Sequence, residues 1–393
     1  MALGPSGNGS EQIPQELVQG TVARGFQPVQ DAFEHLGASE WDVDGQFVAY
    51  HDGTQVVDLW VGDEVQPDDL QGVFSSTKGV SASCLALLAE WGLLDLDEKV
   101  ARYWPEFGGS GKAEVTIRMV LSHQAGIPGV EPQLSLDQLI DHDYAAGRLA
   151  AQYPHWLPGK AHGYHGTTIG TVMDELVRRI DGRSISQFFR EEIGEPRGID
   201  FFITTSVREE PRVRRVRPKI IPGIEPARPS PDSVTGLAFH EAAGWRDLGT
   251  TILPNVARVR QKGQAASSGV GSARGLARLY AMLISEVDGI PRLVSSSTIE
   301  RFAQIQTVGE DLVLQRPTRY GIVYQKADDR LRYGSHQAFG HDGAGGSFGV
   351  ADSWHGVAYA WIPRRMVHPG GADDRGLFMA ATVRSCAREL ERK

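Results

Sequence analysis

The stretch GVFSSTKGVSA, from Gly72 to Ala82, places a serine three residues before a lysine at the start of an apolar helical pattern. Residues i and i+3 share one face of a helix, so the Lys78 amine can lie beside the Ser75 hydroxyl. Ser76 is offset by about 100° around the helix axis and shares that face less well. A serine hydroxyl becomes a good nucleophile only when a nearby base takes its proton. The spacing therefore favours Ser75 over Ser76 as the nucleophile.

A rival serine lies far downstream, where GGSFG from Gly345 to Gly349 fits the pattern G-x-S-x-G. That pattern forms a nucleophile elbow only between a strand and a following helix. After Ser347 the apolar pattern predicts another strand, and the next helical pattern begins only near Leu377. We therefore interpret Ser347 as a small residue at a tight strand start.

The bulk composition narrows the class of protein. A chain of 393 residues can bury a large core, and its net charge of -9 argues against a nucleic-acid partner. The basic cluster from Arg212 to Lys219 is interpreted as a solvated loop. Cys84 and Cys386 cannot form a disulfide framework, and no secretory signal or membrane-length apolar stretch is visible. We expect a cytoplasmic, soluble protein without a membrane partner.

Strand patterns occur at both ends of the chain, with helical patterns between them. The run from Gln46 to Val61 predicts a β-hairpin that turns at Asp52-Gly53, and residues 348–362 predict a second pair of strands. Apolar residues at helical spacing predict further elements, with the most regular helices at 29–36, 76–91, 272–283 and 377–390.

This order predicts a discontinuous α/β architecture. Residues 16–75 and 265–393 are expected to form one α/β lobe, and residues 76–264 a mostly helical lobe. The Pro- and Arg-rich region at 204–262 is expected to be a binding loop or lid, and residues 1–15 a mobile tail.

Four further segments accompany the S-x-x-K pattern in a fixed order, LSHQAGI at 121–127, PGKAHGYHG at 158–166, GRSISQFF at 182–189 and FGHDGAGGS at 339–347. With these segments the chain resembles the superfamily of serine β-lactamases and penicillin-binding proteins. Within it, the chain is most similar to the family VIII carboxylesterases, relatives of class C β-lactamases. The resemblance implies an antiparallel sheet flanked by helices, an all-helical lobe, and an active site in the cleft between them.

The resemblance also implies roles for individual residues. Ser75 would be the acylated nucleophile, Lys78 its partner, and Tyr164 the tyrosine of the family's Y-x-N motif. The backbone N–H groups of Ser75 and Ala344 would form the oxyanion hole. A neighbouring ammonium would favour the phenolate of a tyrosine, whose ordinary pKa is about 10. The Lys78/Tyr164 pair would then take the proton of Ser75 and return one to the leaving alkoxide.

Two positions depart from the β-lactamase pattern. Gly166 stands where the asparagine of Y-x-N would be, and His341-Asp342-Gly343 stands where those enzymes carry K-T-G. The lysine of K-T-G helps to bind a substrate carboxylate, so its loss weakens the case for β-lactam or peptide carboxylate substrates. His341 either contacts the substrate or only orients its strand.

The remaining candidates concern the pocket wall and cofactors. Trp156 and Trp245 are candidate aromatic walls of the acyl or alcohol pocket, and both could instead be ordinary packing residues. No nucleotide motif is present, and His155, His162 and His165 lack a compact metal-ligand spacing. We expect no metal and no cofactor.

The sequence thus predicts a carboxylesterase that cleaves small carboxylic esters through an acyl-enzyme on Ser75. Three alternatives stay open on the same fold: an amidase of the β-lactamase or D-aminopeptidase type, an acyltransferase, and a catalytically silent penicillin-binding module. The presence of Ser75, Lys78 and Tyr164 argues against the silent module, and the sequence makes no prediction of the oligomeric state.

Overall fold

The computed structural model describes residues 18–38, 44–62, 64–218, 228–243, 253–366 and 370–392. The tail expected at 1–15 and the candidate wall residue Trp245 lie outside these ranges.

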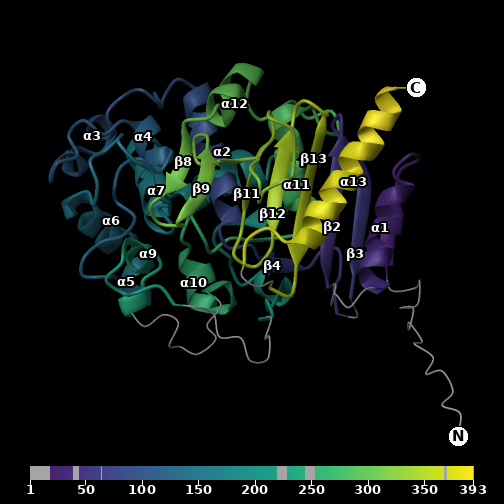
Figure 1. The fold of residues 1–393 in the computed structure, drawn as a ribbon, viewed down its shortest axis with the longest axis horizontal. Coiled ribbons are helices and arrows are strands. Elements are labelled where there is room, and N and C mark those ends of the chain that lie inside the picture. Colours follow the sequence, from purple (N-terminus) through teal and green to yellow (C-terminus); the bar gives the residue numbers. More distant parts are fainter. Residues whose placement is uncertain are drawn as a thin grey trace, which may run out of the picture.

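A nine-stranded antiparallel sheet organises one side of the molecule (Figure 1). Its strand order is β1-β3-β2-β13-β12-β11-β10-β9-β8, so strands from the two ends of the chain pair directly, β2 with β13. This confirms the predicted antiparallel sheet. The strands are β1 (Val18–Val22), β2 (Gly45–His51), β3 (Thr54–Val61), β8 (Thr307–Asp311), β9 (Arg316–Tyr320), β10 (Gln325–Lys326), β11 (Phe339–Asp342), β12 (Phe348–Asp352) and β13 (Val357–Pro363).

The predicted hairpin is the join between β2 and β3. Asp52 and Gly53 both take left-handed backbone angles, with φ of 47° and 78°, as a tight turn between twisted strands requires. Alternate residues of β2 enter two different cores: Phe47 packs into one and Val48 into the other. The sheet is therefore buried on both faces.

Helices cover both faces of this sheet (Figure 1). α1 (Gln27–Ala38) and α13 (Asp374–Glu391) pack on one face, where Phe33 meets Trp361 edge to face at 5.8 Å. α11 (Ala273–Ile284) packs on the other face against β2 and β13. These helices confirm the apolar faces that the spacing predicts.

The rest of the described chain is mostly helical and surrounds α2 (Ser76–Glu90). This helix is buried nearly all round, from Ser76 to Leu88. The helices around it and along the lobe are α3 (Val100–Tyr103), α4 (Ile117–Leu121), α5 (Leu136–Leu139), α6 (His142–Ala151), α7 (Thr168–Asp181), α8 (Ile185–Phe188), α9 (Val234–Ala238), α10 (Ala257–Lys262) and α12 (Ser296–Ala303).

A second, four-stranded sheet of order β5-β7-β4-β6 has no counterpart in the sequence prediction. Its strands have only two or three residues, too few to show a periodic pattern. β4 leads directly into α2, so this small sheet fixes where that central helix begins. The strands are β4 (Leu70–Gly72), β5 (Phe201–Phe202), β6 (Val213–Arg214) and β7 (Val270–Gly271).

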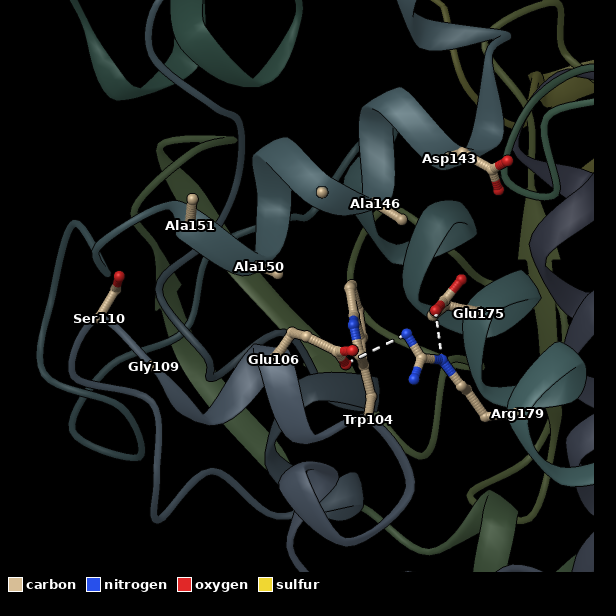
Figure 2. Close-up of a pocket in the computed structure, with 11 residues that line it drawn as sticks. Trp104, Glu106, Gly109, Ser110, Asp143, Ala146, Ala150, Ala151, Glu175 and Arg179 are labelled. Atoms are coloured by element: carbon tan, nitrogen blue, oxygen red, sulfur yellow. Dashed lines mark hydrogen bonds and ion pairs between the residues drawn. The ribbon is translucent and has the colours of Figure 1, made fainter.

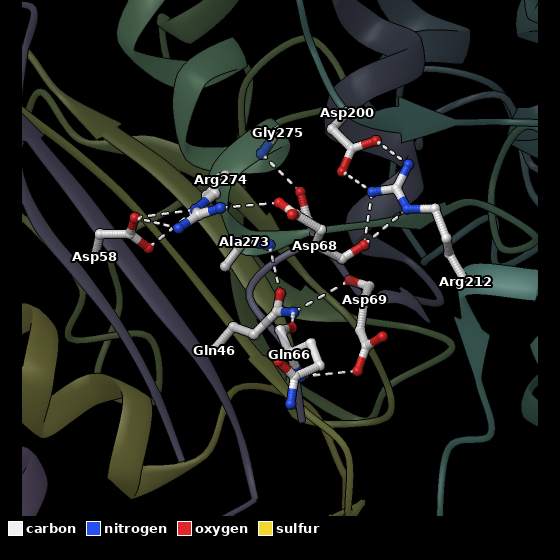
Figure 3. A network of polar contacts seen from close by, with 11 residues as sticks. Gln46, Asp58, Gln66, Asp68, Asp69, Asp200, Arg212, Ala273, Arg274 and Gly275 are labelled. Carbon is white, nitrogen blue, oxygen red and sulfur yellow. Dashed lines mark hydrogen bonds and ion pairs between the residues drawn. The ribbon is translucent and has the colours of Figure 1, made fainter. Parts of the chain in front are cut away.

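A polar network anchors the segment before β4 (Figure 3). The buried Gln46 side chain donates to the carbonyls of Gln66 (2.6 Å) and Asp69 (3.1 Å) and accepts from the N–H of Ala273 (2.9 Å). Arg212 donates to the Asp68 carbonyl. One buried amide thus holds β2, the 66–69 turn and the start of α11 together.

Three arginines of the basic cluster at 212–219, Arg212, Arg214 and Arg217, are paired with acids. Arg212 pairs with Asp200, and Arg214 lies 2.9 Å from Asp69. Since these guanidinium groups have carboxylate partners within the chain, this part of the cluster stabilises the fold.

Among the described residues, no helix combines the length and the apolar character that a membrane span needs.

Candidate active site

The connection from β4 to α2 presents Ser75. Phe74, just before it, has a left-handed backbone with φ of 48°, a costly conformation for a residue with a large side chain. Ser75 occupies the N-cap position of α2, but its hydroxyl makes no capping hydrogen bond. The partly exposed hydroxyl therefore remains available for chemistry at the positive end of the helix dipole.

Lys78 lies one turn later and is completely buried. Its Nζ is 3.0 Å from Ser75 Oγ and donates to the carbonyl of Ala266 at 3.0 Å. Burial lowers the pKa of the Lys78 amine well below its usual value, and the Asp342 carboxylate opposes this effect only in part. The amine is therefore a candidate base in its uncharged form.

Tyr164 reaches the same hydroxyl from the loop before α7. Its phenol donates to Ser75 Oγ at 2.9 Å, and its ring lies 4.8 Å from Lys78 Nζ. Burial raises the pKa of Tyr164, because the charged phenolate would lose its hydration. This corrects the expectation that a neighbouring ammonium favours the phenolate: the phenol stays protonated and can act as a proton donor.

Asp311, a residue that the sequence analysis missed, holds the Tyr164 loop. Its carboxylate is fully buried at the end of β8 and accepts from the backbone N–H of Tyr164 (3.0 Å), Val313 (2.9 Å) and Leu314 (2.9 Å). An aspartate with three backbone donors fixes two loops against each other. No sequence signal separates such an anchor from a surface acid, since only its burial distinguishes it.

Neutral histidines surround the Tyr164 ring. His123 lies 5.2 Å and His341 6.2 Å from it, centroid to centroid. Burial lowers the pKa of His341 to about 3, that of His165 to about 4, and that of His123 well below its usual value. These rings therefore carry no positive charge near neutral pH.

The two other candidate serines, Ser76 and Ser347, are buried and hydrogen-bonded within the fold. Ser347 is buried, and its hydroxyl donates to the Val73 carbonyl at 2.9 Å. Ser76 is also buried, with its Oγ 3.1 Å from Ser347 Oγ. These contacts join the β11–β12 loop to the start of α2, which agrees with the interpretation of Ser347 as a small residue at a strand start.

The β11–β12 loop carries the second predicted oxyanion donor. Gly343 donates to the Ser347 carbonyl at 2.8 Å, and the exposed Ala344 follows it. Among the described residues, the backbone N–H groups of Ser75 and Ala344 have no hydrogen-bond acceptor. Hydrogen bonds of Ser347 with Val73 and Ser76 hold the β11–β12 loop against the start of α2. The two N–H groups without an acceptor therefore belong to one tightly packed corner, formed by this loop and the start of α2.

Hydrogen bonds within the protein hold the side chains of His341 and Asp342. His341 Nδ1 lies 2.7 Å from the Asp342 carbonyl, and its buried Nε2 has no partner among the described residues. The Asp342 carboxylate accepts from Gln325, Arg330 and the backbone of Ala372. The Asp342 side chain is thus engaged within the fold, and substrate contact by either residue stays a prediction.

The α9 segment lies beside Gly166, the position of the missing asparagine. A side chain at Gly166 would begin 3.2 Å from the Ala238 carbonyl and 3.6 Å from the Phe239 ring. The indole of Trp156 donates to the Ala161 carbonyl at 3.1 Å. Its ring packs against a small apolar cluster formed by Tyr164, Ala238, Val313 and Tyr320. Its role as a pocket wall stays a prediction.

No group of three or more His, Cys, Asp or Glu side chains that could hold a metal ion occurs in the described ranges.

Comparison with known proteins places this chain in a family. The model of the β-lactamase family matches residues 29–384, and the chain belongs to that family. LipL of Mycobacterium tuberculosis (strain ATCC 25618 / H37Rv), named an esterase/β-lactamase, is 32% identical over 367 residues, which cover 89% of this chain and 84% of LipL.

Two solved structures share the whole architecture. EstA from Arthrobacter nitroguajacolicus Rue61a superposes with a TM-score of 0.88 at 37% identity, covering 94% of this chain and 98% of EstA. A family VIII carboxylesterase superposes with a TM-score of 0.85 at 30% identity, covering 94% and 99%. These matches confirm the family that the sequence motifs resemble.

We predict that Gly343→Ala destabilises the protein. An added Cβ would lie 2.1 Å from the Val73 carbonyl oxygen and 2.7 Å from Ser347 Oγ, so the loop or α2 must move. We expect a loss of about 2 kcal/mol or more in the free energy of unfolding, measured by urea denaturation. Gly147→Ala in α6 is the matched control, because its Cβ would meet nothing within 4 Å. Equal stability of the two variants would contradict the tight packing of this corner.

Proposed function

We propose that this protein is a serine carboxylesterase that acylates and deacylates Ser75. The observation that carries the proposal is the meeting of Lys78 Nζ and the Tyr164 phenol at Ser75 Oγ, at 3.0 Å and 2.9 Å. The family membership supports it, and so do the name of the family VIII carboxylesterase and the esterase part of the name of LipL, an esterase/β-lactamase. All three side chains of the family's serine chemistry are present.

In the acylation step, Ser75 Oγ attacks the ester carbonyl carbon while the uncharged Lys78 amine takes its proton. The carbonyl π electrons move to the oxygen, and the N–H groups of Ser75 and Ala344 bind the resulting oxyanion. Collapse of this intermediate breaks the bond to the alcohol oxygen. The protonated Tyr164 donates its proton to that leaving oxygen and recovers one from the Lys78 ammonium.

Deacylation repeats these roles with water. Water gives a proton to Lys78 as its oxygen attacks the acyl carbon, and the tetrahedral intermediate releases Ser75, which regains a proton through Tyr164. Both half-reactions need the same protonation states at the start, a neutral amine and a neutral phenol. The lowered pKa of Lys78 and the raised pKa of Tyr164 both favour these protonation states.

A small uncharged ester is the proposed substrate class. The lysine that binds a substrate carboxylate in β-lactamases is replaced by His341, whose pKa is lowered to about 3. A neutral imidazole supplies no charge to a β-lactam carboxylate, so that carboxylate would lose hydration without an ion pair in return. The same argument weakens the amidase alternative for substrates with a free carboxylate.

We predict that Ser75→Ala lowers kcat/KM for p-nitrophenyl acetate by at least about 10⁴-fold, because no other described serine has both partners. Ser347→Ala is the matched control and should keep the rate within about tenfold, since the Ser347 hydroxyl bonds to the Val73 carbonyl and has neither Lys78 nor Tyr164 as a partner. Peptide mass spectrometry after a fluorophosphonate should find the adduct on Ser75 in the wild type. An adduct on Ser347 would overturn the assignment.

We also predict a preference for esters over β-lactams. The ratio of kcat/KM for p-nitrophenyl butyrate to that for a chromogenic cephalosporin should exceed about 10³. His341→Lys should narrow this ratio by improving cephalosporin turnover, because it restores the lysine of the β-lactamase pattern and with it a donor for the substrate carboxylate. Faster turnover of the cephalosporin than of the ester by the wild type would contradict the proposed substrate class.

A further inference from the structure

Two cavities of similar size lie among the described residues away from Ser75. The charged side chains that line them are compensated differently. The first, about 510 Å³, lies in the helical lobe beside α6 (Figure 2). Its Arg179 is 3.1 Å from Glu106 and 2.7 Å from Glu175, so its cation is already neutralised. This arrangement gives no reason to bind a further charged group.

The second cavity, about 550 Å³, lies between α12, the end of α11 and the beginning of β11. Its apolar wall is formed by Ile284, Ile299, Ala303, Ile305 and Phe339. A pocket of this volume is in the range that takes small organic ligands.

Lys326 lines this second cavity and is 4% exposed. Its amine has one long contact, 3.5 Å to the Gln337 carbonyl, and no carboxylate of a described residue lies within ion-pair distance. The acid that acts on it electrostatically, Asp352, accepts hydrogen bonds from Ser335 instead. A buried ammonium in this position is poorly compensated.

The buried amine of Lys112 has more hydrogen-bond acceptors than that of Lys326. Lys112 is also buried, but its amine donates to the carbonyls of Ala150 and Gln152 and is satisfied by them. Lys326 has no such pair of acceptors.

Arg292 lines the same cavity and also lacks an ion pair among the described residues. Its guanidinium donates to Ser296 Oγ (2.6 Å) and to the Leu283 carbonyl (2.8 Å), both of which are neutral. Its Nε is buried without a partner. Glu300 also lines the cavity and acts on Arg292 electrostatically, but it makes no ion pair with it. Two cations therefore line one cavity, and neither has a carboxylate of a described residue within ion-pair distance.

We propose that this second cavity is a binding site for an amphipathic carboxylate, such as a medium-chain fatty acid. The carboxylate would accept from Lys326, with Arg292 as the second cation, and its hydrocarbon chain would lie against the apolar wall. Charge-assisted hydrogen bonds of this kind are stronger than those between neutral groups. The site is separate from the hydrolytic reaction and does not rest on the proposed function.

The test is isothermal titration of the full chain with sodium octanoate and with 1-octanol. We expect octanoate to bind about tenfold or more tightly than the alcohol, and Lys326→Met to weaken octanoate binding by about tenfold or more. Lys99→Met is the control, because Lys99 is an exposed lysine paired with Glu114, and it should bind octanoate as the wild type does. If Lys326→Met does not fold, Arg292→Gln provides the same comparison.

A photoreactive diazirine analogue of octanoate locates the binding site independently of affinity. We expect crosslinks on peptides that contain Ile299, Ile305 or Phe339. Crosslinks confined to peptides that contain Ser75 or Tyr164 would overturn the proposal, because they would assign the binding to the catalytic site. Equal affinity for octanoate and octanol, or unchanged affinity in both variants, would also overturn it.

Discussion

The Lys78 amine is buried beside Ser75 without a carboxylate in contact with it, and the rest of the site depends on this arrangement. A charged ammonium at this position would lose its hydration and gain only a hydroxyl and one carbonyl as partners. Its pKa is therefore low, and the uncharged amine can accept a proton from Ser75. Burial also raises the pKa of Tyr164, so one physical cause favours the protonation states of both the proposed base and the proposed acid.

The fold maintains this burial by packing around α2. Gly79 follows Lys78, and a Cβ at that position would lie 2.0 Å from the Tyr280 hydroxyl, so glycine allows α11 to approach α2 closely. On another side, Ser76 and Ser347 join α2 to the β11–β12 loop. Asp311 fixes the Tyr164 loop. The proposed nucleophile, acid and oxyanion donors therefore come from segments distant in sequence that pack on one helix.

Much of the fold and part of the candidate site could be predicted from the sequence, wherever local patterns are strong. The Asp52-Gly53 turn and the α1, α11 and α13 faces follow from turn chemistry and apolar periodicity. The i, i+3 spacing also predicted the contact between Lys78 and Ser75. The protonation state of Tyr164 was predicted in the wrong direction, because a pKa depends on burial in three dimensions. Neither the short strands of the four-stranded sheet nor the anchoring role of Asp311 produces a periodic pattern in the sequence.

The departures from the β-lactamase pattern are consistent with one another. His341 and the histidines near Tyr164 are neutral, and the α9 segment occupies the space beside Gly166. The site thus has fewer charged groups for a substrate carboxylate while it keeps the serine, lysine and tyrosine. This combination suits hydrolysis of neutral esters on a β-lactamase fold.

The most direct test of the account is the titration of Lys78 itself by NMR of protein with ¹³C,¹⁵N-labelled lysine, with Lys78→Arg used to assign its signal. The account predicts that the Lys78 side-chain resonances titrate with a midpoint well below the ordinary lysine value of about 10.4, so that the uncharged amine is present at a lower pH than in an exposed lysine. A midpoint at or above that ordinary value would contradict the account, because the proposed base would then be protonated throughout the working range.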